Sequence, residues 1–217
     1  AYGSPQTQNN FIDQKLDGFL LNNKEKLNNI FFTGDVFYEP SEEKWDSLNN
    51  KYGVDKNIII APGNHELLTT EKNKKAFKIF QKSDYPYEFE SDGFKLIIED
   101  SFTNSWLMKN DVIELLQKGN YKQKILLRHH IPVSEFIYLA NSTMGLEEKL
   151  PTINELLDLI NKKTIMIIGD SGVYDFMPRI FCYRKKHITF IINGLGGKDN
   201  DTIILMSKNK IYKHTLR

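Results

Sequence analysis

The chain has 217 residues, with 29 Lys and Arg against 28 Asp and Glu, so its formal net charge is +1. This near-neutrality argues against a dedicated nucleic-acid binder or a membrane-surface protein. Hydrophobic residues make up 40% of the chain and charged residues 26%, which is typical of a globular domain and not of a disordered segment.

The single cysteine, Cys182, excludes a disulfide framework and a zinc site built on several thiolates. Its strand-like neighbours predict that it is a small core residue. No apolar run reaches the ~18 residues that a membrane span needs. We find no secretory signal pattern either, and we expect a cytoplasmic protein without a membrane span.

The first third of the chain alternates between helical and strand patterns. Apolar residues recur at helical spacing, and Ser41 has the character of a helix N-cap. Two short apolar runs between the helices are typical of buried strands. In chain order, we predict a helix over 11–20, a strand over 30–33, a helix after Ser41, a strand over 58–61 and a helix over 71–81.

A hairpin is predicted in the middle of the chain, because alternating residues flank Asp92-Gly93, a dipeptide typical of tight turns. The segment 134–147 is predicted to be a loop long enough to form a lid, and 101–110 a second loop beside the site. The predicted elements here are strands over 85–90 and 94–98, a helix over 110–118 and a strand over 125–127.

In the last third, Pro151 suits the first position of a helix, which we expect to end near Lys163. A buried strand is predicted over 164–168. Three later strands, over 188–192, 202–206 and 211–215, suggest an antiparallel meander. Because helices and strands alternate early and antiparallel strands come late, we predict a mixed α/β layered domain.

Polar side chains follow four of the predicted buried strands. The four clusters are Gly34-Asp35, Gly63-Asn64-His65-Glu66, His129-His130 and Gly169-Asp170. Ligand sites in α/β sheets lie just beyond the carboxyl ends of strands, so these clusters are expected at one edge. Asp, Asn and His ligands without sulfur suit Mn²⁺, Fe, Zn²⁺ or Co²⁺. The adjacent glycines allow sharp turns and close backbone approach.

These motifs, in this order and spacing, resemble those of the calcineurin-like metallophosphoesterases. The Gly63-Asn64-His65-Glu66 block is the most specific part, and His129-His130-Ile131-Pro132 extends the match. The resemblance covers nearly the whole chain. It implies one domain over 1–217 with a four-layer αββα sandwich, two metal ions at the strand ends and hydrolysis of a small-molecule phosphate ester by hydroxide attack on phosphorus.

The resemblance also implies roles for single residues. Asp35 would bridge the two metal ions, and Asn64 and Asp170 would bind the second ion. His129 would be a further ligand of the second ion, with His130 as the alternative. His65 would contact the phosphate and protonate the leaving oxygen, and Glu66 would fix the His65 ring.

Three residues depart from the family pattern, and all three fall among the ligands of the first ion. Ser4 and Gln6 stand where the family has Asp and His, and Gly172 stands where it has a second His. We therefore expect one ion, or none held tightly, instead of two. Two ions would clamp the attacking and leaving oxygens together, and one ion cannot do both. Other residues that could fill the gap are Asp175, Glu99 and Asp100.

Arg128 and Arg179 are the predicted substrate-binding residues, because a guanidinium matches phosphate through its fork of donors. Tyr38 and Tyr174 are candidates for stacking on a substrate ring, with core packing as the equally supported alternative for each.

Trp45 and Trp106 are expected to pack between helices.

Two functions remain open on the sequence. One is an active metal-dependent phosphoesterase. The other is a catalytically weak or inactive relative that binds a ligand or partner through the same cleft.

Overall fold

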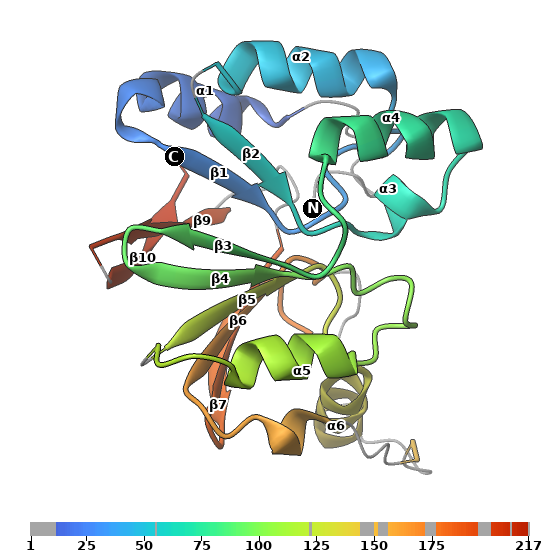
Figure 1. Cartoon of the computed structure of the whole chain (residues 1–217), viewed down its shortest axis with the longest axis vertical. Coiled ribbons are helices and arrows are strands. Elements are labelled where there is room, and N and C mark those ends of the chain that lie inside the picture. Colours follow the sequence, from blue (N-terminus) through green and yellow to red (C-terminus); the bar gives the residue numbers. More distant parts are fainter. Residues whose placement is uncertain are drawn as a thin grey trace.

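The protein is a mixed α/β fold (Figure 1). The computed structural model describes residues 12–54, 56–121, 123–143, 150–151, 156–171, 177–194, 201–208 and 210–216. The helices are α1 (Gln14–Asn22), α2 (Glu42–Tyr52), α3 (Asn64–Leu67), α4 (Glu71–Gln81), α5 (Asn110–Gln117) and α6 (Val133–Thr143), with the 3-10 turns η1 (Lys24–Lys26) and η2 (Leu156–Leu159). The strands are β1 (Asn29–Phe32), β2 (Asn57–Ile60), β3 (Tyr87–Ser91), β4 (Phe94–Ile98), β5 (Lys124–Arg128), β6 (Thr164–Ile168), β7 (Ile180–Lys185), β8 (Ile188–Asn193), β9 (Thr202–Ser207) and β10 (Lys210–Thr215).

Strands β1 and β2 form a parallel pair, which α1, α2 and α4 cover on its outer side (Figure 1). Side-chain oxygens cap these helices: the Ser41 hydroxyl accepts from Lys44 N, and Thr70 caps α4 in the same way. Trp45 fills the space between α2 and α4, at 1% exposure, with its ring stacked on Phe80. The expected packing role of Trp45 is therefore confirmed.

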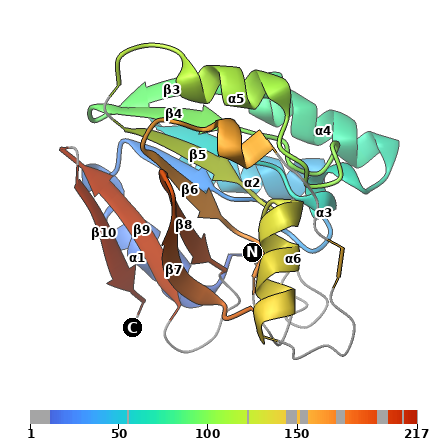
Figure 2. The same cartoon turned by 90° about the horizontal axis from the view of Figure 1, so that it is seen from below.

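The largest sheet has the strand order β3-β4-β5-β6-β8-β7 within the described residues. Its four inner strands are parallel, while β3 and β7 pair antiparallel at the two edges. Every residue of β5 and β6 is buried, as expected of parallel strands covered on both faces. Helices α5 and α6 lie on the face away from β1 and β2 (Figure 1), and Figure 2 shows both helices from below.

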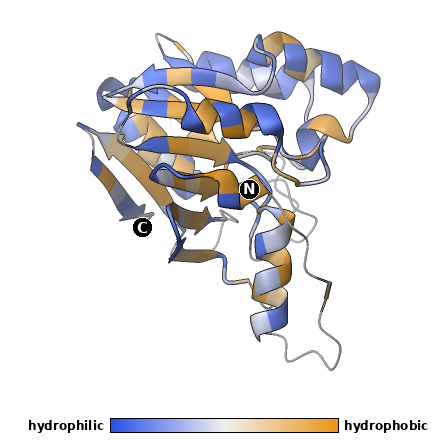
Figure 3. Ribbon diagram, turned by 60° about the horizontal axis from the view of Figure 1, so that its bottom comes forward, coloured by the Kyte–Doolittle hydropathy of each residue, from blue (hydrophilic) through white to orange (hydrophobic). Residues whose placement is uncertain are grey.

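Apolar side chains fill the spaces between these elements. One cluster joins α1, α2 and α4 to the β1–β2 pair. A second lies between that pair and the six-stranded sheet, and includes Ile59, Leu96 and Ile167. A third joins the far face of the sheet to α5, through Leu126, Met166 and Val112 among others. The inner strands of the large sheet are accordingly mostly apolar, whereas α5 has one apolar face (Figure 3).

Most of the predicted elements are confirmed. Helix α4 and strand β6 have the predicted bounds. The predicted hairpin is also present: β3 and β4 pair antiparallel around Asp92 and Gly93, which both have positive φ, as a two-residue turn of this kind requires. No helix in the described part of the chain combines the length and apolar character that crossing a bilayer needs.

Two predictions about loops and helices are wrong. The segment predicted as a lid-like loop contains helix α6, whose residues Ile137 and Ala140 are buried. The helix expected to run to Lys163 is not helical over 160–163, and only the turn η2 is helical among its described residues. Lys162 Nζ there donates to the carbonyls of Gln117 and Gly119 at the end of α5, which holds the chain in another conformation.

Two predictions about the late strands are also corrected. Strands β9 and β10 pair antiparallel as expected, but β8 pairs with β6 and β7 instead of joining them in a meander. The reason is the apolar alternation of β8, which buries Ile188, Phe190 and Ile192 in the core of the large sheet. Cys182 is exposed and not in the core, because it lies on the edge strand β7.

Candidate metal centre

A buried carboxylate joins the two loops that follow β1 and β2. Glu66, on α3, is fully buried. Its Oε2 accepts the main-chain N–H groups of Asp35 and Gly63, and its Oε1 accepts that of Val36, each at 2.8 Å. One side chain therefore fixes both loops relative to each other. Burial, and then the nearby Asp35 carboxylate, raise the pKa of Glu66 against the effect of these donors.

Two glycines allow these loops to approach closely. Gly34 has φ +81, and a Cβ there would lie 2.6 Å from both Gly63 N and His129 Nδ1. A Cβ on Gly63 would lie 2.2 Å from Asp35 Oδ1. No side chain fits at either position without moving the neighbouring atoms. The close approach expected of these glycines is confirmed.

His65 is held by the main chain of the β1 loop. Its ring Nδ1–H donates to the Tyr38 carbonyl at 2.6 Å, and its main-chain N–H donates to Asp35 Oδ1 at 3.0 Å. The expectation that Glu66 fixes the His65 ring is therefore wrong, because both Glu66 oxygens are engaged with main-chain N–H groups. The Tyr38 carbonyl has that role, while the Tyr38 ring lies 5.3 Å from the His65 ring.

His129 connects the large sheet to the β1 loop. It follows β5, and its ring Nδ1–H donates to the Thr33 carbonyl at 2.7 Å. Its carbonyl accepts the N–H groups of Gly169 and Asp170 at 3.1 and 2.8 Å, which brings the end of β6 alongside. Its Nε2 is buried and lies 3.1 Å from Asp35 Oδ2, with which it forms an ion pair when the ring is protonated.

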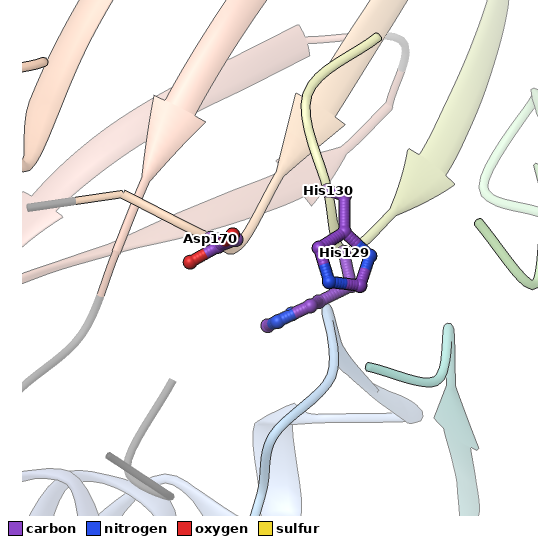
Figure 4. A group of neighbouring side chains, drawn as sticks. All are labelled: His129, His130 and Asp170. Carbon is purple, nitrogen blue, oxygen red and sulfur yellow. The ribbon is translucent and has the colours of Figure 1, made fainter. Parts of the chain in front are cut away.

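His129, His130 and Asp170 form one cluster at the ends of β5 and β6 (Figure 4). Each offers one ligand atom, and these atoms lie within 4.8 Å of one another. His130 is 2% exposed, and its ring lies edge-on to that of His129, with 4.5 Å between the ring centroids. Three of the predicted ligands therefore meet, and Asp35 faces one of them. Asn64 opens helix α3 directly after the β2 loop.

The electrostatics of the cluster follow from burial and from the opposed charges. Burial acts to raise the pKa of Asp35, but the adjacent His129 and then His65 outweigh it and lower this pKa. Burial acts to lower the pKa of His129, but Asp35 and then Asp170 outweigh it and raise this pKa. For Asp170 burial dominates and raises the pKa. Burial and then the neighbouring His129 lower the pKa of His130 to about 2, so this ring is neutral.

The residues present fit a divalent metal ion. His129, His130 and Asp170 offer two imidazole nitrogens and a carboxylate oxygen within 4.8 Å of one another. The Asp35 carboxylate lies 3.1 Å from the buried His129 Nε2. This nitrogen and oxygen donor set is one that Mn²⁺, Fe, Zn²⁺ or Co²⁺ accepts.

The prediction for Arg128 is corrected. Its guanidinium is fully buried and donates to the carbonyls of His130 and Trp106, and it lies 3.4 Å from Glu99. Since every one of these partners belongs to the protein, Arg128 supports the site and does not reach a substrate.

Arg179 forms an ion pair with Asp201. Its carbonyl accepts from the Ser171 hydroxyl, so its main chain contacts the loop after β6. Substrate binding by Arg179 stays a prediction.

The residues considered as replacements for lost ligands do not join the cluster where they are described. Glu99 is buried beside Arg128, and burial raises its pKa to about 7 in spite of that cation. Asp100 accepts from Phe102 N, Thr103 N and the Thr103 hydroxyl. Asp175 lies outside the described residues, as do Ser4, Gln6, Gly172 and Tyr174.

Sequence reasoning missed two residues beside His130. The Ser101 hydroxyl contacts the His130 ring, and Trp106 stacks on that ring. Trp106 also packs edge-on against Phe136 of helix α6, in agreement with the helix-packing role that was expected. Strand β4 is parallel to β5, so its carboxyl end lies at the same edge. Strand β4 is thus a fifth strand that ends in polar residues at this edge, and this pattern could have indicated Ser101.

No protein-family model matches the chain. Over 109 residues, half of the chain, it is 24% identical to the membrane-bound lytic murein transglycosylase F of Shewanella oneidensis. The match covers 22% of that protein, so the chain spans only about a fifth of the length of this relative. A similarity this distant does not decide the function.

Proposed function

We propose that the chain is a metal-dependent phosphoesterase of the calcineurin-like class that hydrolyses a small-molecule phosphate ester. The observation that carries the proposal is the cluster of His129, His130 and Asp170, whose ligand atoms lie within 4.8 Å of one another. The buried His129 Nε2 also faces Asp35 Oδ2 at 3.1 Å. His65, the proposed proton donor, lies directly beside Asp35.

The arrangement of the core supports the four-layer αββα sandwich of this class. Three apolar clusters follow one another from α2 and α4, through the β1–β2 pair and the large sheet, to α5. Such a succession is expected when two sheets pack face to face and each carries helices on its outer side.

Asp35, His129 and Asp170 would hold the ion, with Asn64 and His130 as further ligands. When bound, the ion would act as a Lewis acid on a phosphate oxygen and lower the pKa of water towards neutrality. The ligand atoms of His129, His130 and Asp170 lie within 4.8 Å of one another, which supports a single ion.

His65 would donate the proton that the leaving oxygen needs. Its Nδ1–H is held by the Tyr38 carbonyl, so Nε2 is the ring nitrogen that can face a substrate. The hydrogen bond from His65 N to Asp35 Oδ1 keeps this ring at a fixed place beside the cluster. A proton donor positioned in this way typically contributes about 10²–10⁴-fold to a rate.

The test combines metal content with hydrolysis of p-nitrophenyl phosphate, on protein stripped with a chelator and reloaded with Mn²⁺. We expect turnover to follow metal loading. Asp35→Asn is expected to lower metal affinity by more than about 100-fold, beyond the usual effect of residues outside the ligand shell, and to abolish turnover. Asp46→Asn, an exposed site on α2, is the matched control.

Two outcomes would overturn the proposal in different ways. Metal binding without turnover would favour the inactive relative that binds a ligand or partner through the same cleft. No metal binding at all would leave a resemblance to the phosphoesterases in fold alone.

A further inference from the structure

We propose that Ser101, Trp106 and Arg128 are positioning residues that fix the ring of His130, so that its Nε2 serves as a metal ligand. This inference rests on the proposed function, because it specifies how one side of the same site is built. Ser101 and Trp106 come from the loop between β4 and α5, and Arg128 is the last residue of β5.

Ser101 holds His130 at two points. The fully buried Ser101 hydroxyl accepts the main-chain N–H of His130 at 3.0 Å. It also lies 3.1 Å from the ring Nδ1 of His130, within hydrogen-bond distance. Because Nδ1 is engaged in this way, Nε2 is the ring nitrogen with which His130 would bind the ion, beside His129 and Asp170.

Trp106 holds the ring by its face. The Trp106 indole is stacked on the His130 ring, with 4.8 Å between centroids and 11° between planes. The backbone adopts an unusual conformation to place it there, because Ser105 has φ +49 and Trp106 has φ +68. A positive φ is costly for a bulky residue and is found where the surrounding structure imposes it, often at functional sites.

Arg128 helps to hold this conformation, together with main-chain hydrogen bonds from Ser105 N to the Phe102 carbonyl and from Trp106 N to the Ser101 carbonyl. The Arg128 Nε donates to the His130 carbonyl at 2.7 Å, and its Nη2 donates to the Trp106 carbonyl at 2.6 Å. The same guanidinium therefore holds the main chain of His130 and the main chain of Trp106, whose indole stacks on the His130 ring. Glu99 faces this guanidinium at 3.4 Å, and both side chains are fully buried. Because a guanidinium presents its donors in a rigid plane, it fixes the distance between the main-chain segments of His130 and Trp106.

The first test is the Mn²⁺ affinity of variants. Residues that orient a ligating histidine typically change metal affinity by about 10–100-fold, and we expect this loss for Ser101→Ala and for Trp106→Ala. Trp106→Phe keeps an aromatic face and is expected to restore most of the affinity. Thr103→Ala is the matched control, because Thr103 lies in the same loop and contacts Asp100 but not His130.

A double-mutant cycle shows whether Ser101 acts through His130. If it does, Ser101→Ala has no further effect on Mn²⁺ affinity in the His130→Ala background. An equal loss in both backgrounds would overturn the proposal. The proposal would also be overturned if His130→Ala kept the wild-type Mn²⁺ affinity while Asp35→Asn lost the metal. That outcome would leave the proposed function intact.

The second test needs neither metal nor turnover, so it separates this inference from the proposed function. In the metal-free protein, ¹⁵N NMR of the histidine rings reports which ring nitrogen carries the proton. We expect Ser101→Ala to shift the Nδ1 and Nε2 resonances of His130 and to leave those of His65 unchanged. Unchanged His130 resonances would overturn the proposal even if the wild-type protein binds no metal.

Discussion

The two sides of the candidate site are held by different kinds of contact. On the side of β1 and β2, the Glu66 carboxylate accepts main-chain N–H groups from both loops. On the side of β4 and β5, Ser101 and Trp106 contact the ring of His130 directly, and Arg128 holds the main chains of Trp106 and His130.

Both sides nevertheless depend on contacts between segments that are distant in the sequence. Glu66 and Gly63 belong to one motif, but Asp35 and Val36 lie 31 and 30 residues before Glu66. On the other side, Ser101 and His130 are 29 residues apart, and Trp106 and Arg128 are 22 residues apart. A short motif can therefore indicate which residues lie at the site, whereas the contacts that hold them depend on how the sheets are assembled.

The largest expected effect is on the Glu66 side. Glu66→Ala leaves three buried N–H donors without an acceptor, each costing about 1–3 kcal/mol, partly offset because the buried carboxylate itself is removed. We expect a loss of about 3–4 kcal/mol of unfolding free energy in urea titrations. Glu71→Ala, an exposed position on α4, is the control and should stay within about 0.5 kcal/mol. A small loss in Glu66→Ala would mean that the two loops are held by something else.

The second effect concerns pH on the other side, at Glu99. Burial raises the pKa of Glu99 from 4.5 to about 7, so the folded state holds this proton more tightly than the unfolded chain. The stability that Glu99 contributes is therefore present below pH ~4.5 and is lost as the pH rises to about 7.

Glu99→Gln removes this titration. Between pH 4.5 and 8, the unfolding free energy of the wild type should fall by up to about 3 kcal/mol relative to that of Glu99→Gln. Urea unfolding at several pH values measures the difference. Parallel pH profiles for the two proteins would contradict the prediction, and Glu25→Gln, at an exposed position, provides the control.

The smallest effect lies where the two sides meet, at Gly63. A Cβ there would lie 2.2 Å from Asp35 Oδ1 and 2.8 Å from His129 Nε2. We expect Gly63→Ala to cost about 2 kcal/mol through overpacking and to weaken Mn²⁺ binding. Gly18→Ala is the matched control, because nothing lies within 4 Å of its Cβ and it sits inside helix α1. This control should gain up to about 1 kcal/mol, and equal melting temperatures for the two variants would contradict the prediction.

The sequence predicted much of the fold because its patterns are local. The periodicity of α4 and the apolar run of β6 placed both elements with their observed bounds. The segment 134–147 was missed as a helix, although apolar residues from Phe136 to Ala140 recur at helical spacing and Ile137 and Ala140 are buried. Strand β8 was assigned to the wrong neighbours, since pairing depends on which face of a strand finds an apolar partner.

The sequence by itself determined which residues lie at the ends of the strands. Asp35, His129 and Asp170 follow buried strands, and parallel strands bring such residues to one edge. The tertiary structure alone decided how their neighbours are used. Arg128 is directed into the core and not towards a substrate, and the Tyr38 carbonyl, not Glu66, holds His65. The physical reason is that a side chain's direction and partners depend on contacts with distant segments, which no local pattern encodes.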